Sequence, residues 1–389
     1  MIFRDAIRDD LDAAWRLRTT AFGGPRERPA AWPGDLSAER QYVAEEGDRL
    51  SGFLRVRRYG QFFGGKAVPM GGIASVAVDP YARGKGVASG LLDAALAGMR
   101  EDGQPLSTLF TGVPPLYRGR GWERAGVVEW AELPIDALRW VKRPLAQVSL
   151  GPIDKSSLDD VHACYLAAAA EIDGMLDRSG PAFPLEPLLD RDLFTLARSG
   201  SELRGYLDAE HGPDGVLDVS SLIAQDSDTL AELLRSLGSW AGQLQRVQFR
   251  LADPEVLSLV LPSAPGKPRV KPWYLRVVDL PTAVAARGWP NARFLADGTS
   301  AEIEILDEHA PWHAGRHRLV VRDGSVHCEP GGVGTPVRLQ SRALGPWFSG
   351  SASTSTLRRA GLLDGAPAQA AVLDTLTATH TTPHMLDMF

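Results

Sequence analysis

Ser75–Gly90 reads SVAVDPYARGKGVASG: an apolar, β-branched run followed by a glycine-rich turn that carries two cations, Arg83 and Lys85. The apolar run predicts a strand that ends at Pro80, and the spacing of apolar residues over 91–99 predicts a helix after the turn. Such a turn presents unpaired backbone N–H groups at the positive end of the helix dipole. The sequence therefore predicts an anion site, suited to a pyrophosphate, between this strand and this helix.

The whole chain has the composition of a globular protein, with 44% hydrophobic and 23% charged residues. Its 389 residues suggest two or three domains, and a net charge of -6 makes nucleic acid an unexpected partner. Cys164 and Cys328 cannot form a disulfide framework and lack the spacing of metal ligands, which favours a cytoplasmic location. The charged start MIFRDA does not resemble a secretion signal, and no apolar run approaches the roughly 20 residues of a membrane span.

The part of the chain around this stretch predicts further strands. Strands are expected at Arg49–Arg57 and Lys66–Met70, joined by a turn at Gly60–Gly65, and both precede the separate run at 76–78. Leu106–Thr111 predicts another buried strand, which leads into a short helical turn at Leu116–Trp122. A strand, a capping carboxylate and an amphipathic helix are expected at the very start of the chain.

A second strand–turn–helix pattern lies further along the chain, at Val216–Leu237. It lacks the glycines and cations of the first pattern, and the aspartates at its turn would repel a phosphate. Ile153–Tyr165 likewise echoes Ile7–Leu17, with an acidic cap before an amphipathic helix. These echoes indicate either a duplicated domain that has lost its anion site or an unrelated α/β domain.

The C-terminal part predicts an α+β domain with one antiparallel sheet. Residues alternate in polarity over Ala301–Asp307 and again over His317–Arg322, where the Asp323–Gly324 pair predicts a hairpin turn. Helices are expected at Ser341–Phe348, Ser353–Ala360 and Ala366–Thr377.

Three histidines in this part recur every four residues, at His309, His313 and His317. Pro311 and Gly315 would interrupt any helix that could align them, and no acidic partner completes a ligand set. We therefore expect turn and sheet-surface histidines and no metal site.

Several motifs can be compared with a known family. Arg83–Ala88, RGKGVA, fits the coenzyme A pyrophosphate signature of GNAT N-acetyltransferases, Gln/Arg-x-x-Gly-x-Gly/Ala. Leu116–Trp122, LYRGRGW, resembles the Ile-Tyr-Gly-Arg-Phe-Gly-Tyr motif of the Eis (enhanced intracellular survival) family of acetyltransferases. Trp273–Ala283, WYLRVVDLPTA, is similar to that family's Trp-Leu-Arg-x-x-x-Val-Pro-Ala-Ala, and the chain ends on a phenylalanine as the family does. The resemblance covers the whole chain.

The resemblance implies the fold and the domain boundaries. The fold class is α/β (α+β), with tandem GNAT domains at 1–143 and 144–284, of which the second is degenerate. A sterol-carrier-protein-like α+β domain follows at 285–389, and its terminus completes the active site of the first domain.

The resemblance also implies acetyl transfer from acetyl-CoA to a primary amine of a small molecule, without a metal. Such a site needs an oxyanion donor, an acid for the departing thiolate and a base for the ammonium proton. Tyr117 matches the family's general acid, and the α-carboxylate of Phe389 matches its general base. A carboxylate beside an apolar ring is a stronger base than one in water. Residues that match cofactor contacts are Val76, Ala77, Val78, Arg83, Gly84, Lys85, Gly86, Val87, Ala88, Ser89, Gly112 and Val113.

The chain departs from the family around the amine pocket. Phe22 matches a first-helix phenylalanine, but a glycine stands where an aspartate is expected after it. Trp32 and Asp35 are further candidates for substrate binding. Fewer acids weaken the case for polycationic aminoglycosides as substrates. The paired prolines at 114 and 115 also remove two N–H donors next to Val113.

Two other interpretations stay open. The same fold could use a bulkier acyl-CoA or act on a specialised metabolite, or the chain could be a ligand-binding protein with a vestigial GNAT domain. By resemblance we expect a homo-oligomer, commonly a hexamer, with neither a nucleic-acid nor a membrane partner.

Overall fold

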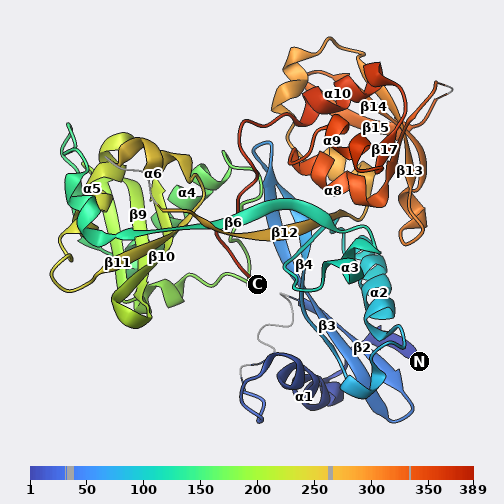
Figure 1. Ribbon diagram of the computed structural model, residues 1–389, viewed down its shortest axis with the longest axis horizontal. Coiled ribbons are helices and arrows are strands. Elements are labelled where there is room, and N and C mark those ends of the chain that lie inside the picture. Colours follow the sequence, from blue (N-terminus) through green and yellow to red (C-terminus); the bar gives the residue numbers. More distant parts are fainter. Residues whose placement is uncertain (31, 33–38, 262–265, 333) are drawn as a thin grey trace.

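A twelve-stranded sheet forms the backbone of two lobes of the molecule in the computed structural model (Figure 1). The structure describes residues 1–30, 32, 39–261, 266–332 and 334–389. The strands follow the order β1-β2-β3-β4-β5-β12-β6-β11-β10-β9-β8-β7. Their bounds are β1 (Ile2–Asp5), β2 (Glu39–Glu46), β3 (Arg49–Phe63), β4 (Lys66–Val78), β5 (Leu106–Leu109), β6 (Glu123–Pro134), β7 (Ser149–Pro152), β8 (Leu193–Ser199), β9 (Glu202–His211), β10 (Val216–Ala224), β11 (Arg246–Leu251) and β12 (Arg269–Val277).

The strand order reads the same from both ends. Strands β1 to β5 run inward from one edge and β7 to β11 from the other, and β12 and β6 meet in the centre. Each half has one parallel pair, β4 with β5 and β10 with β11. A parallel pair needs a crossover, which a helix supplies in each half. The duplication that the sequence suggested is therefore confirmed by the topology.

The helices of the two halves correspond in the same way. The helix that follows the first strand, the crossover helix and a short helix after the fifth strand recur in order. These are α1 (Leu11–Phe22), α2 (Val87–Glu101) and α3 (Pro114–Arg118) in the first half, and α4 (Leu158–Ala169), α5 (Ser227–Gly238) and α6 (Glu255–Val260) in the second.

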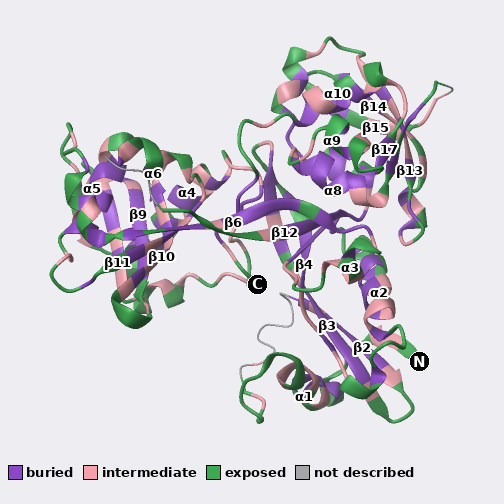
Figure 2. Ribbon diagram, in the orientation of Figure 1, coloured by how far each residue is buried: buried purple, intermediate pink, exposed green. Residues whose placement is uncertain are grey.

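The centre of the sheet mixes the two halves. β12 lies between β5 and β6, although it follows β11 in the sequence, and it pairs antiparallel with both neighbours. Figure 2 shows that β6 and β12 are largely buried where the lobes meet. The strand order therefore does not separate at residue 143, and the boundaries at 143 and 284 stay predictions.

The third lobe is the expected α+β domain. Its five-stranded sheet has the order β15-β14-β13-β16-β17, and four helices accompany it. The bounds are α7 (Leu280–Ala286), β13 (Ser300–Leu306), β14 (Gly315–Arg322), β15 (Ser325–Pro330), β16 (Val337–Gln340), α8 (Ser341–Ser349), α9 (Thr354–Arg359), β17 (Leu363–Asp364) and α10 (Pro367–Thr377).

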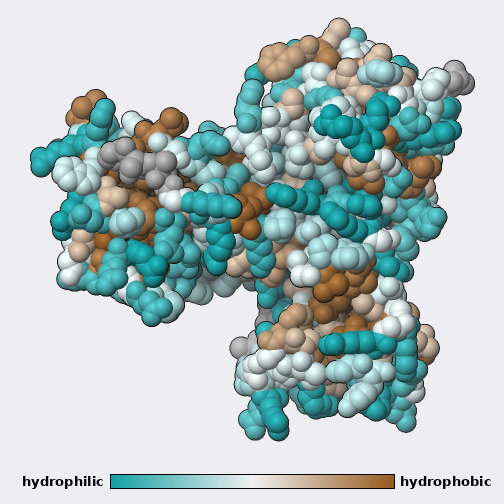
Figure 3. Space-filling model, in the orientation of Figure 1, coloured by the Kyte–Doolittle hydropathy of each residue, from teal (hydrophilic) through white to brown (hydrophobic). Residues whose placement is uncertain are grey.

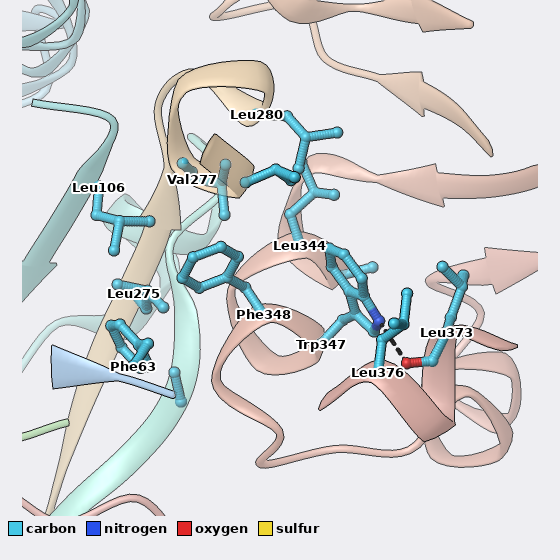
Figure 4. Close-up of a cluster of buried hydrophobic side chains, with 14 of the residues drawn as sticks. Phe63, Leu106, Leu275, Val277, Leu280, Leu344, Trp347, Phe348, Leu373 and Leu376 are labelled. Carbon is cyan, nitrogen blue, oxygen red and sulfur yellow. Dashed lines mark hydrogen bonds between the residues drawn. The ribbon is translucent and has the colours of Figure 1, made fainter. Parts of the chain in front are cut away.

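Helix α8 joins this third lobe to the large sheet. Figure 4 shows Phe348 pointing toward Leu275 and Phe63, while Trp347 faces α10 and donates to the Leu373 carbonyl at 3.1 Å. A Cβ at Gly345 would lie 2.3 Å from the Leu275 carbonyl oxygen, so α8 can approach β12 this closely only with glycine there.

Two expectations about these elements are wrong. The run at 76–78 is not a separate strand, because β4 continues without a break from Lys66 to Val78 and includes a bulge at Ser75. His313 lies in a turn as expected, at Pro311–His313, but it does have an acidic partner: it is 1% exposed and its ring Nε2 lies 2.9 Å from Asp307. Among the described residues, no helix is long and apolar enough to cross a bilayer.

Candidate active site

The loop between β4 and α2 leaves its backbone uncovered. Gly84 and Gly86 have φ angles of 79° and 80°, a left-handed conformation that favours glycine. No described atom lies within 4 Å of the place that a Cβ would take at either residue. Helix α2 starts after Gly86 without a side-chain cap and without an acidic residue in its first turn. The first N–H groups of the helix are therefore available to an anion.

The charges around this loop have both signs. Arg83 and Lys85 are exposed, and the Lys85 Nζ lies 3.8 Å from the carboxylate of Glu46. Both groups of that pair are more than half exposed, so the pairing is weak and the cation can turn toward a ligand. The donor set and the open glycines fit a pyrophosphate.

Beyond the loop, β4 has an open edge. The parallel ladder between β4 and β5 ends at the pair Gly72–Thr108, whereas β4 continues to Val78 paired with β3 alone. The backbone of Val76–Val78 therefore faces the gap where β5 has diverged. An unpaired strand edge of this kind can accept an extended amide-bearing chain as an additional strand.

Tyr117 lies on α3, directly after β5. Its side chain is 8% exposed and packs edge-on against Trp122, with ring centroids 6.3 Å apart. Burial raises the pKa of Tyr117 to about 12, although a side-chain hydrogen bond with Thr111 works in the opposite direction. The phenol therefore stays protonated at neutral pH, as a general acid must be.

Ion pairs hold α3 against the rest of the molecule. Glu123 at the start of β6 accepts from Arg118 of α3 at 2.7 Å and from Arg342 of α8 at 2.6 Å. The carboxylate is 9% exposed, although the two arginines that donate to it are 44% and 35% exposed. The third lobe thus contributes to the position of Tyr117.

The last residues of the chain return to the centre of the molecule, where Figure 1 shows the C-terminus between the lobes. Val127 of β6 donates to the Pro383 carbonyl and accepts from the Met385 N–H, both at 3.0 Å. The His384 N–H donates to the Asp173 carbonyl at 3.0 Å. The tail is therefore hydrogen-bonded to both halves of the sheet and is not a frayed terminus.

Phe389 ends this tail against β4. Its ring lies 4.9 Å from the ring of Tyr59 and 5.7 Å from that of Phe110. A Cβ at Gly72 would come within 2.7 Å of the Phe389 ring. The final residue thus packs on the backbone of the last β4 residue that still pairs with β5.

Tyr117 and Phe389 lie on opposite faces of the sheet. Gly72 faces the Phe389 ring, whereas the next residue, Ile73, packs in the same hydrophobic cluster as Tyr117. Successive strand residues point to opposite faces, so the two groups flank the opening between β4 and β5. Figure 3 shows an apolar area on the surface where Figure 1 places α3 and β3.

The other residues expected at the site lie further out, on exposed parts of the chain. Gly112 and Val113 are exposed in the loop between β5 and α3, and the Val113 N–H donates to the Thr111 hydroxyl at 2.8 Å. Phe22 ends α1 and is 58% exposed. Val113 is the N-cap of α3, four residues before Tyr117, and the ring contacts described for Phe389 and Tyr117 involve none of the three.

Trp32 lies under α1 against β3. Its ring contacts Trp15 at 5.1 Å and Phe53 at 5.8 Å, on the face of β3 that also carries Tyr59 six residues along. Its buried indole N–H has no partner among the described residues. Asp35 lies outside the described residues.

The corresponding helix start in the second half is already occupied. Asp226 caps α5 by accepting from the Thr229 N–H at 2.8 Å. Asp228 in the first turn accepts from the N–H groups of Leu145 and Ala146 at 2.7 and 3.1 Å. One N–H of the helix start is thus bonded to Asp226, and the carboxylate of Asp228 adds a second negative charge in the first turn.

Sequence reasoning missed the contacts of the tail. A glycine inside a strand signals a close approach, so the Gly71–Gly72 pair could have pointed to the packing of Phe389. Tyr59, Phe110 and Arg178, which surround the tail, carry no local pattern that marks them.

Comparisons with known proteins agree with this geometry. Residues 3–125 match the family described as acetyltransferase (GNAT) domain, and residues 280–386 match the sterol carrier protein domain family. The chain carries a GNAT acetyltransferase domain within an Eis-type fold. Eis1 from Mycobacterium abscessus has the same fold at 21% identity, with a TM-score of 0.78 and full coverage of both chains.

Two relatives share more sequence with this GNAT protein. A GCN5-related N-acetyltransferase from Kribbella flavida is 28% identical, with a TM-score of 0.85 over 100% of this chain and 98% of that one. An uncharacterized N-acetyltransferase of Streptomyces coelicolor is 28% identical over 333 residues, which cover 77% of this chain and 75% of that protein. The tandem fold with a sterol-carrier-like third domain is thus confirmed, and the GNAT acetyltransferase match applies to residues 3–125.

Proposed function

We propose that the chain transfers an acetyl group from acetyl-CoA to a primary amine of a small molecule, at the open edge of β4. The observation that carries the proposal is the packing of Phe389 on Gly72, where β4 leaves β5, with Tyr117 on the other face of the same opening. A vestigial domain would have no reason to keep these three features together.

The residues on the two sides of the opening would have separate roles in the reaction. Acetyl-CoA would supply the thioester, with its pyrophosphate at Arg83–Ser89 and its amide-bearing arm along Val76–Val78. An N–H of that strand would donate to the thioester carbonyl as negative charge develops on its oxygen. The new C–N bond would form as the C–S bond breaks.

Two proton transfers complete the reaction. The carboxylate of Phe389 would accept the proton that the amine loses, and the Tyr117 phenol would donate its proton to the departing sulfur. Because the two groups lie on opposite faces, the amine approaches from the side of α1 and Trp32. Phe22 and Asp35 are the further residues we assign to amine binding.

The resemblance adds two features to the proposal. We expect a homo-oligomer, as a hexamer, and a cytoplasmic location. Gly112 and Val113 would contact acetyl-CoA where the loop after β5 borders the opening.

The test measures turnover of acetyl-CoA with a panel of primary amines. The readout is the release of free thiol. We expect Tyr117→Phe and deletion of Phe389 each to lower kcat by about 100-fold, since each removes one proton-transfer group. Affinity for coenzyme A should stay within about twofold in both variants, because neither residue lies at the anion loop.

A pair of tagged proteins provides the control. The same short tag should abolish turnover at the C-terminus, where it removes the free carboxylate, and leave turnover intact at the N-terminus. Full activity of the C-terminally tagged enzyme would contradict the role of the terminal carboxylate. Wild-type kcat in Tyr117→Phe would contradict the role of the phenol.

A further inference from the structure

Arg178 of the second half contacts the tail two residues before its end. Its Nε donates to both carboxylate oxygens of Asp387, at 3.1 and 3.2 Å, and its Nη2 donates to the Ser221 hydroxyl at 3.1 Å. The guanidinium also stacks over the ring of Tyr165 at 4.2 Å. The Arg178 and Asp387 side chains are only 19% and 15% exposed.

The backbone at Arg178 is held in an unusual conformation. Its φ is 46°, in the left-handed region that non-glycine residues rarely adopt. The residues before it are tied to β3 of the first half: the Phe62 N–H donates to Met175 at 2.7 Å and the Asp177 N–H donates to Gly60 at 2.9 Å. The segment therefore fixes the arginine relative to the sheet that carries the opening.

A second arginine contacts the tail one residue earlier. Arg250 of β11 donates to the Leu386 carbonyl at 2.8 Å, and its side chain comes from the strand that pairs with β10. Arg178 reaches Ser221, which lies on β10. The parallel pair of the second half, which lacks an anion loop, thus contacts the tail directly through Arg250 and supports Arg178 through Ser221.

Only two residues follow Asp387, so the free end of the tail is short. From Asp387 to Phe389 the chain spans at most about 7 Å, so a fixed Asp387 confines the terminal carboxylate to a small volume. The ring of Phe389 against Gly72 and Tyr59 then sets its direction. Backbone bonds and Arg250 hold residues 383–386, so without the Arg178 contact only Asp387 and the two residues after it would be free to lift away from the opening.

We propose that Arg178 is a positioning residue that fixes Asp387 and so holds the Phe389 carboxylate beside the open edge of β4. This inference rests on the proposed function, and it gives the degenerate second GNAT domain a task in the reaction. That domain would act through the tail without touching substrate.

The test compares Arg178→Ala, Arg178→Lys and Asp387→Asn in the full-length protein. The acceptor is the amine with the highest turnover in the panel above. We expect kcat to fall by about 10- to 100-fold in Arg178→Ala and Asp387→Asn, since a base displaced by about 1 Å loses this much. KM for acetyl-CoA should not change, and Arg178→Lys should recover part of the loss.

A readout independent of activity is the release of Phe389 by carboxypeptidase A, followed by intact mass. We expect release to be at least about 10-fold faster in Arg178→Ala and Asp387→Asn than in wild type, because cleavage follows the population of the undocked tail. Asp387→Asn keeps the arginine and the strained backbone, so it covers the case in which Arg178→Ala fails to fold. Arg198→Ala is the matched control, because its arginine lies in the same domain but pairs with Asp160 and donates to the Ser201 carbonyl instead of bonding to the tail.

The two possible failures are distinguishable. Full turnover after deletion of Phe389 would contradict the terminal base itself. Wild-type release of Phe389 in both Arg178→Ala and Asp387→Asn would contradict the positioning role, as would fast release combined with wild-type kcat.

Discussion

The two halves of the large sheet have the same strand order but opposite electrostatics at the start of the crossover helix. In the first half, α2 begins after Gly86 with no side-chain cap and no acid in its first turn. In the second half, Asp226 caps α5 and Asp228 follows it. The same strand–turn–helix therefore offers uncapped N–H groups in one half, whereas in the other half Asp226 bonds to one N–H and Asp228 adds a second negative charge.

The cleft beside α5 carries the same negative charge. A cleft of about 940 Å³ lies in the second half at the ends of β10 and β11. Asp226, Asp253 and Glu255 line it, and Thr382 and His384 of the tail border it. An acidic cleft repels a pyrophosphate, so the comparison teaches that the topology alone does not make a cofactor site. The side chains at the helix start decide it.

The largest effect is expected when an acidic residue is introduced into the open loop between β4 and α2. Gly86→Asp should weaken coenzyme A binding by about 100-fold, or about 2.8 kcal/mol, measured by isothermal titration calorimetry. The aspartate would stand at a φ of 80° and add a negative charge where the pyrophosphate belongs.

Gly200→Asp is the matched control for this substitution. Gly200 has a φ of 61° in the turn between β8 and β9, with no described atom within 4 Å of a Cβ. The Gly200→Asp substitution introduces the same residue at a similar φ angle, and we expect this variant to keep wild-type affinity for coenzyme A. Unchanged affinity in Gly86→Asp would show that the loop is not the anion site.

A smaller effect, on stability, is expected from a substitution at the start of α5 in the second half. Asp226→Ala removes the cap of α5 and should lower the free energy of unfolding by about 1 kcal/mol in urea denaturation. Coenzyme A affinity should not change, because this helix start holds no cofactor. An altered affinity in this variant would mean that the second half takes part in cofactor binding.

The anion loop could be predicted from the sequence because its signals are local. Two glycines with positive φ, a strand before them and an amphipathic helix after them all lie within Ser75–Met99. The helices α8, α9 and α10 also fall within a residue or two of their expected bounds, and local start signals accompany two of them, the Ser353 cap of α9 and Pro367 at the start of α10.

The missed features depend on contacts between distant residues. β12 enters the sheet between β5 and β6, and no local pattern encodes which strands a segment will join. The continuity of β4 through Gly71–Gly72 was missed because glycines resemble a turn in sequence. Arg178 meets Asp387 across 209 positions, so its role emerges only in three dimensions.

The central claim is that one half of the duplicated sheet binds acetyl-CoA and the other half does not. The most direct measurement is the stoichiometry of coenzyme A binding per chain, by isothermal titration calorimetry on the full-length protein. The account predicts one site per chain, which Gly86→Asp weakens and Asp226→Ala leaves intact. Two sites per chain, or one site that responds to Asp226→Ala and not to Gly86→Asp, would contradict it.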